Sequence, residues 1–140
     1  MINKQLAFYK GPGRLFDKLI RWWTGSPYSH VAIIVAGQCF EADAWQGKVV
    51  SRPWANNYNP DNWDMVDIEH DTSPASWLAD QVGKRYDYLG ILGFLIPWRF
   101  DVESWWYCSE LAAAWLNLDP SELSPGELKS DVDCEQKLAI

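Results

Sequence analysis

Cys108 stands at the beginning of an apolar stretch, CSELAAAWL, that spans residues 108–116. If this stretch is a helix, its N-terminus carries a partial positive charge, which favours a thiolate over a thiol. The first backbone N–H groups of a helix lack intrahelical acceptors, so they can donate to an oxyanion. Leu111, Ala112 and Trp115 would anchor the helix in the core. Cys108 is therefore a candidate nucleophile, and the alternative is a buried structural cysteine.

His30 directly precedes the β-rich apolar run Val31–Ala36, which predicts a buried strand. A histidine at the mouth of such a strand can face a cleft and act as a general base toward Cys108. Glu41 follows across a predicted hairpin, where its carboxylate could hold the imidazole by the other ring nitrogen. Asp43 lies on the same strand face, so it is the second candidate for this orienting role. The other histidine, His70, is expected to be solvated in a charged loop.

The number of cysteines also favours a nucleophile. The chain has three, Cys39, Cys108 and Cys134, and an odd number at wide spacing does not form a disulfide framework. The sequence contains neither a CxxC nor an HExxH motif, so we expect no metal site and no cofactor. A nucleophilic thiol is the role that remains for one of the three.

The elements that would position these residues follow from hydrophobic periodicity and from turn residues. An apolar stripe predicts a helix over Arg14–Trp23, and Ser73 is expected to cap a second helix that begins at Pro74 and ends near Val82. Ser124 and Glu127 fit a capping box that begins a short helix. The remaining expectations are a helix in the Trp105–Leu118 region, strands over Gln5–Tyr9, Gln38–Trp45, Lys48–Ser51 and Trp63–Ile68, a turn at Gly37-Gln38, and an edge strand over Gln136–Ile140. Together they predict an α+β fold with a small antiparallel sheet packed against helices.

The composition sets outer limits on the function. The 140 residues are expected to form one domain, residues 1–140, and ten tryptophans are more than one small core can hold, so some should lie at the surface or line a groove. The net charge of -7 argues against nucleic-acid binding. The apolar run Tyr88–Trp98 is too short to span a bilayer. No signal peptide is recognisable, so we expect a cytoplasmic protein, and release by lysis or in a virion stays open.

Several short motifs, in the same order along the chain, resemble the permuted papain-like amidases of the YiiX type, relatives of the NlpC cell-wall peptidases. The resemblance covers roughly residues 5–130, and in this family the His also precedes the Cys. It rests on Pro27-Tyr28-Ser29-His30-Val31-Ala32-Ile33, Phe40-Glu41-Ala42, Gly83-Lys84-Arg85-Tyr86-Asp87-Tyr88, Leu92-Gly93-Phe94, Tyr107-Cys108-Ser109-Glu110-Leu111 and Leu123-Ser124-Pro125-Gly126-Glu127-Leu128.

The resemblance implies a circularly permuted papain-like (NlpC-type) fold with Cys108 as nucleophile, His30 as base and Glu41 as orienting residue. It further implies a hydrolase, a cysteine peptidase or amidase, that cleaves a peptide amide bond, including those of peptidoglycan stems, through a thioester. Tyr28 and Tyr107, the neighbours of the predicted site residues, are candidates for lining the substrate cleft.

Two other functions remain open. The first is a lipid acyltransferase or thioesterase of the lecithin–retinol acyltransferase type, which the apolar segment Leu89–Trp98 would support by interfacial lipid contact. The second is a non-catalytic binding module, because an acidic, aromatic-rich surface also suits a protein partner. The oligomeric state does not follow from the sequence.

Overall fold

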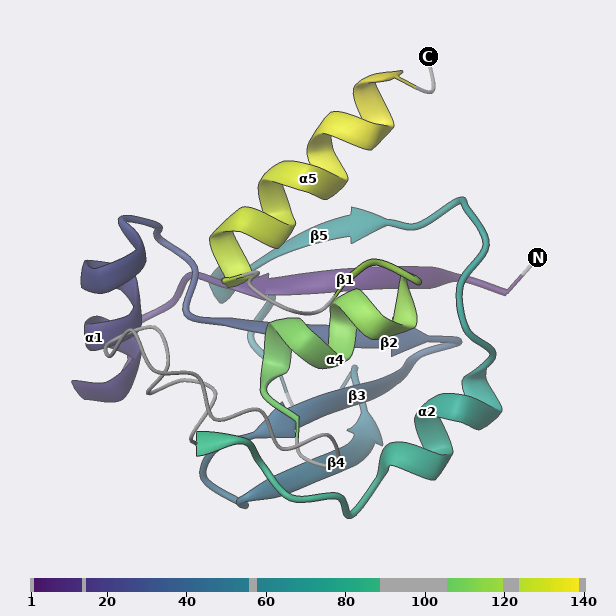
Figure 1. Ribbon diagram of the computed structural model, residues 1–140, viewed down its shortest axis with the longest axis horizontal. Helices are drawn as coiled ribbons and strands as arrows, with labels where there is room; N and C mark the ends of the chain where they lie inside the picture. Colours follow the sequence, from purple (N-terminus) through teal and green to yellow (C-terminus); the bar gives the residue numbers. More distant parts are fainter. Residues whose placement is uncertain (1, 14, 56–57, 89–105, 120–123, 139–140) are drawn as a thin grey trace.

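A five-stranded antiparallel sheet organises the chain, in the strand order β4-β3-β2-β1-β5 (Figure 1). The computed structural model describes residues 2–13, 15–55, 58–88, 106–119 and 124–138. The strands are β1 (Lys4–Tyr9), β2 (His30–Val35), β3 (Gln38–Asp43), β4 (Lys48–Pro53) and β5 (Trp63–Asp67). The helices are α1 (Leu15–Thr24), α2 (Ala75–Gln81), α4 (Cys108–Trp115) and α5 (Pro125–Leu138), and a 3-10 turn, η1, spans Pro60–Asn62. The predicted α+β class with a small antiparallel sheet is confirmed.

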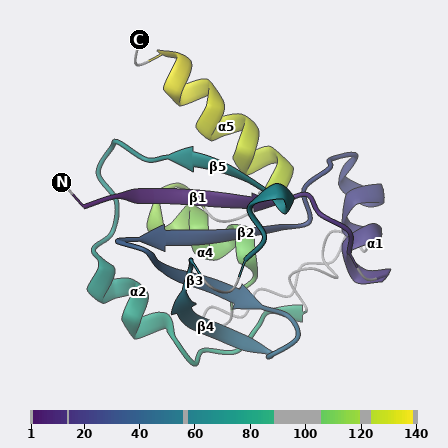
Figure 2. The same ribbon diagram turned by 180° about the vertical axis from the view of Figure 1, so that it is seen from behind.

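Both faces of the sheet are covered, but by different means. On one face α4 packs across β2 and β3, while α5 lies beside β1 and β5 (Figure 1). The main core forms there around the fully buried Phe8, Leu111 and Trp115. The opposite face, seen in Figure 2, carries a smaller cluster that the segment after β4 covers. This second cluster joins Ala7, Ala32, Ile34 and Cys39 to the aromatic side chains of Trp54, Tyr58 and Trp63.

The β2–β3 hairpin sets which side chains of β3 reach which face. Val35 pairs with Gln38, so the turn consists of Ala36 and Gly37 rather than the predicted Gly37-Gln38. Both turn residues have positive φ, 51° and 79°, as the right-handed twist of a two-residue hairpin requires. Since side chains alternate along a strand, this register puts Phe40 in the main core and Cys39 in the smaller cluster. Glu41 lies two residues after Cys39 and therefore points to the same face of the sheet, as the sequence predicts.

Three expectations at helix ends need correction. Pro74 itself is the N-cap of α2, and the Ser73 hydroxyl donates instead to Asn117 Oδ1 at 3.2 Å. The capping box at Ser124 and Glu127 is present, but α5 extends through 14 residues, so it is not short. Residues 136–138 therefore belong to a helix and not to an edge strand, because no Gly or Pro interrupts the chain after Gly126.

Candidate active site

The nucleophile candidate sits where the sequence predicts it, at the first residue of α4. Tyr107 is the N-cap, and the Cys108 residue is only 4% exposed. Leu111, Ala112 and Trp115 are fully buried against the sheet, so the helix that carries the sulfur is held rigidly. The helix N-terminus directs its partial positive charge toward this sulfur.

His30 is the first residue of β2 and connects the two other candidate residues. Its Nε2 lies 2.8 Å from Glu41 Oε2, and its imidazole interacts with the Cys108 side chain. Because Nε2 is occupied by the carboxylate, Nδ1 is the ring nitrogen that remains for the sulfur. Packing of α4 on β2 thus brings together a thiol, an imidazole and a carboxylate from distant parts of the chain.

Glu41 is the carboxylate that contacts His30, and Asp43 is not. Glu41 is 6% exposed, and its Oε1 accepts a hydrogen bond from Tyr58 at 2.8 Å and forms an ion pair with Arg52 at 3.1 Å. Asp43 turns away from the imidazole: its Oδ1 accepts from the backbone of Trp45 at 2.8 Å, and its Oδ2 pairs with Arg52 at 2.8 Å. The choice between the two acids, which the sequence leaves open, is therefore decided by geometry.

The electrostatics of the pair favour its charged form. Burial alone would lower the pKa of His30, but the Cys108 sulfur and the Glu41 carboxylate raise it well above 6.5. Burial alone would raise the pKa of Glu41, but His30, Tyr58 and Arg52 together lower it below 4.5. The raised pKa of His30 and the lowered pKa of Glu41 both favour an imidazolium paired with a carboxylate.

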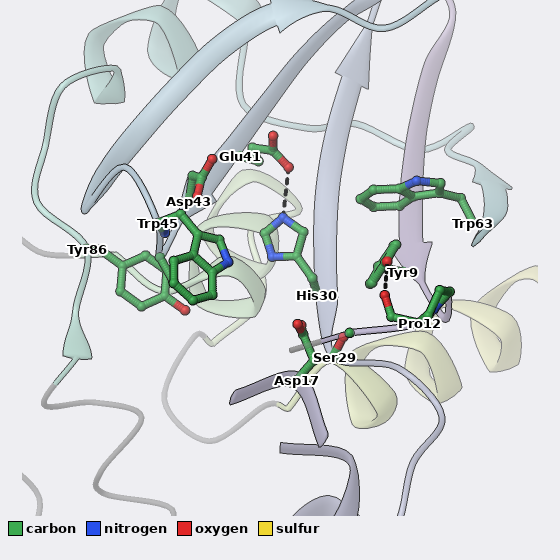
Figure 3. A pocket seen from close by; sticks show the side chains of 12 residues that line it. Tyr9, Pro12, Asp17, Ser29, His30, Glu41, Asp43, Trp45, Trp63 and Tyr86 are labelled. Atoms are coloured by element: carbon green, nitrogen blue, oxygen red, sulfur yellow. Dashed lines mark hydrogen bonds and ion pairs between the residues drawn. The ribbon is translucent and has the colours of Figure 1, made fainter. Parts of the chain in front are cut away.

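A cleft of about 520 Å³ opens beside the imidazole (Figure 3). His30, Glu41 and Asp43 form its polar wall, and Trp45, which is 66% exposed, stands at its edge. The pKa of Tyr86, which also lines the cleft, is raised well above 10.0 by burial and by the charge of Cys108. His30 and Tyr86 line this cleft and both interact electrostatically with Cys108, which is not itself among the lining residues. The other lining residues are Tyr9, Pro12, Gly13, Asp17, Ser29, Ala44 and Trp63.

The two tyrosines expected to line the cleft lie elsewhere. Tyr28 packs against the main core, and its hydroxyl donates to Asp64 Oδ2 at 2.5 Å. Tyr107 is 7% exposed within the main core. Tyr28 is held away from the cleft by its hydrogen bond to Asp64 and its edge contact with Phe8, whereas the next two residues, Ser29 and His30, line the cleft. The aromatic wall is formed instead by Tyr9 and Trp63, which pair with each other across β1 and β5.

Sequence reasoning missed the polar residues behind Glu41. Arg52 pairs with Cys39 in the β3–β4 ladder, so it shares a strand face with Glu41 two residues further along β3. The hairpin register, had it been extended to β4, could have located this arginine. Tyr58 belongs to an irregular segment with no periodic pattern, and no local signal points to it.

The other two cysteines differ sharply from Cys108. Cys39 is fully buried, and burial raises its pKa to about 12. Cys134 is exposed on α5. His70, the second histidine, is exposed after β5 as expected, and its carbonyl accepts a hydrogen bond from Lys4 at 2.7 Å. Cys108 is thus the cysteine that contacts an imidazole.

Within the described ranges, no group of three or more His, Cys, Asp or Glu side chains could hold a metal ion. None of the helices in those ranges combines the length and the apolar character needed to cross a bilayer. Comparison with protein-family models, with curated proteins and with solved structures yields no match. The chemistry of the site therefore has to be inferred from its own geometry.

Proposed function

We propose that this chain is a cysteine hydrolase that cleaves an amide bond through a thioester, on a circularly permuted papain-like fold of the YiiX type. The observation that carries the proposal is the position of His30 between two groups. Its imidazole contacts the Glu41 carboxylate on one side and, on the other, the thiol at the first residue of a buried helix. A nucleophile beside a base that is held by an orienting acid is the constellation that acyl transfer requires.

The proposed reaction has two steps. His30 takes the proton of Cys108 before substrate binds, and the sulfur then attacks the carbonyl carbon of the substrate to form a tetrahedral oxyanion. The N–H of Cys108 and the N-terminal charge of α4 stabilise this oxyanion. The C–N bond then breaks, and the amine leaves with the proton from His30. In the second step His30 deprotonates a water that cleaves the thioester, which releases the acid and restores the thiol.

The raised pKa of His30 suits this sequence of proton transfers. It favours an imidazolium beside the sulfur before substrate binds, so the proton for the leaving amine is already in place. Glu41 stabilises that imidazolium and fixes the ring orientation without needing to take the proton itself.

The three cysteines allow a test within one protein. We expect substoichiometric iodoacetamide near neutral pH to alkylate Cys108 before the exposed Cys134, although Cys108 is far less accessible, and to leave Cys39 unmodified. Peptide mass spectrometry measures the three rates together. In His30→Ala the preference for Cys108 should be lost. If Cys134 reacts first in the unaltered protein, the active-site assignment is wrong and a binding module becomes the better interpretation.

The substrate class needs a second assay. We expect hydrolysis of peptide amides, with peptidoglycan stem peptides as the first substrates to examine, and hydroxylamine should trap the acyl group as a hydroxamate. Cys108→Ser in a Cys134→Ser background should be inactive. Transfer of a fatty acyl group from phospholipid vesicles, without peptide cleavage, would favour the acyltransferase instead. The apolar segment 89–98 on which that alternative depends lies outside the described residues.

A further inference from the structure

We propose that Arg52 and Tyr58 are positioning residues for the proposed hydrolase, which hold Glu41 so that one of its oxygens always faces His30. This inference rests on the proposed function for its kinetic consequences, but its geometry is independent of any substrate. Among the described residues, no contact joins Arg52 or Tyr58 to Cys108 or to His30. Both residues would therefore act on the site through Glu41.

The two oxygens of Glu41 have different partners. Oε2 faces His30 Nε2 at 2.8 Å, while Oε1 accepts a hydrogen bond from Tyr58 at 2.8 Å and pairs with the Arg52 guanidinium at 3.1 Å. A carboxylate with donors on only one oxygen can rotate about its Cγ–Cδ bond and exchange the two. The Tyr58 hydrogen bond and the Arg52 ion pair on Oε1 oppose that rotation, since it would disrupt both. They thereby keep Oε2 in place for the imidazole.

Tyr58 is itself held by aromatic packing and by its hydroxyl partners. Its ring stacks on Trp54 at a centroid distance of 4.1 Å and meets the edge of Trp63 at 5.5 Å. The hydroxyl also lies 3.2 Å from Cys39 Sγ. A hydroxyl has one proton, and a carboxylate is the stronger acceptor, so that proton goes to Glu41 while the Cys39 thiol donates to the phenol oxygen. The buried Cys39 is thus the start of a short hydrogen-bond chain that ends at the site.

Arg52 connects this carboxylate to the wall of the cleft. The same guanidinium nitrogen lies 3.1 Å from Glu41 Oε1 and 2.8 Å from Asp43 Oδ2. Asp43 in turn accepts from the backbone N–H groups of Trp45 and Gln46, which shapes the turn that bears Trp45 at the edge of the cleft. One cation therefore holds both the orienting acid and the turn beside the substrate.

The charge balance agrees with the geometry. Arg52 and Tyr58 both help to lower the pKa of Glu41, whereas burial raises it. Removing either donor should therefore make Glu41 easier to protonate, and a protonated Glu41 no longer stabilises the imidazolium. A residue that only fills space would not move this titration.

The test uses the full chain carrying Cys134→Ser, with Tyr58→Phe, Arg52→Gln, Arg52→Lys and, as a matched control, Lys129→Gln. Lys129 also pairs with a carboxylate, Asp133, but within α5, and neither residue lines the cleft. The rate of Cys108 alkylation by iodoacetamide is measured against pH. We expect the acid limb to move upward by about one pH unit in Tyr58→Phe and in Arg52→Gln, which is about a tenfold slower reaction on that limb. The acid limb should move less in Arg52→Lys than in Arg52→Gln, because Lys keeps the positive charge. In Lys129→Gln the acid limb should lie at the same pH as in the parent protein.

Proton NMR gives a readout that needs no reactivity. In the parent and in Lys129→Gln, the His30 Nε2–H hydrogen-bonded to Glu41 should give a resonance far downfield of the amides at neutral pH. It should weaken or disappear in Tyr58→Phe and in Arg52→Gln. If this resonance and the acid limb are both unchanged in two folded variants, the positioning role is refuted. If the resonance responds but Cys108 is never preferentially alkylated, the positioning holds and the proposed hydrolase fails. Tyr58→Phe removes a single oxygen, so it keeps the test available should Arg52→Gln not fold.

Discussion

Replacing Glu41 by Gln should destabilise the fold by an amount that depends on pH in a defined way. The substitution preserves the shape of the side chain but removes its charge. Gln retains one carbonyl oxygen, which can still accept from Tyr58 and Arg52, and its NH₂ group then faces His30 Nε2 at the position of the former ion pair. The energetic loss is therefore concentrated in the contact between Glu41 and His30.

The size of the loss follows from the exposure of the partners. Breaking a fully buried ion pair costs about 3–5 kcal/mol. Here the side chains of His30 and Arg52 are 21% and 36% exposed, so solvent screens part of the interaction. We therefore expect Glu41→Gln to lower the free energy of unfolding by about 2–3 kcal/mol near neutral pH.

The pH dependence gives the sharper prediction. The folded-state pKa of Glu41 is depressed, so its stabilising contribution is complete above its ordinary value of 4.5 and is lost as the pH falls through the lowered value. In strong acid the wild-type residue is protonated and resembles Gln. The difference in stability between wild type and variant should therefore shrink toward zero as the pH falls below about 4.

Urea unfolding followed by circular dichroism measures this difference at a series of pH values. Asp43→Asn is the matched control, because Asp43 shares Arg52 with Glu41 but does not contact His30. Its remaining oxygen still accepts from the backbone, so the expected loss is below about 1 kcal/mol. A Glu41→Gln loss no larger than that of the control, or one that persists undiminished into acid, would refute the reasoning.

Two further predictions concern the β2–β3 hairpin, which also carries Glu41. Ala36→Gly should raise the urea midpoint without changing the slope, because Ala36 has a φ of 51°. Relief of that left-handed conformation is worth about 1–2 kcal/mol, of which roughly half is offset by the greater freedom of unfolded glycine; a lower midpoint would contradict this. His30→Gln should lower the free energy of unfolding more at about pH 6 than at about pH 10. The raised folded-state pKa means that the contribution of His30 is complete below its ordinary value of 6.5 and is lost as the pH rises through the raised value. Equal losses at both pH values would show that the imidazole is not charged in the folded protein.

Most of the secondary structure could be predicted from the pattern of residues along the chain. Alternation over Gln38–Asp43 correctly separated Phe40 from Cys39 and Glu41, because adjacent side chains of a strand must point to opposite faces. Cys108 could be placed at a helix start because the apolar residues that follow it repeat at helical spacing. The predicted ends of α2 and α5 were less accurate. Ser73 hydrogen-bonds Asn117 on a distant segment instead of capping α2, and α5 contains no Gly or Pro after Gly126 that would end it early.

What local pattern could not provide was contact between segments. His30 meets Cys108 only because α4 packs across β2, and that packing depends on the whole buried core rather than on either motif. The choice of Glu41 over Asp43 was likewise decided by Arg52 and Tyr58, which reach the carboxylate from β4 and from an irregular segment. Residue types and their periodicity thus determined which chemistry this chain could support and on which elements. Tertiary packing alone decided which side chains meet, because hydrogen bonds and ion pairs act over a few ångströms, whatever the separation along the chain.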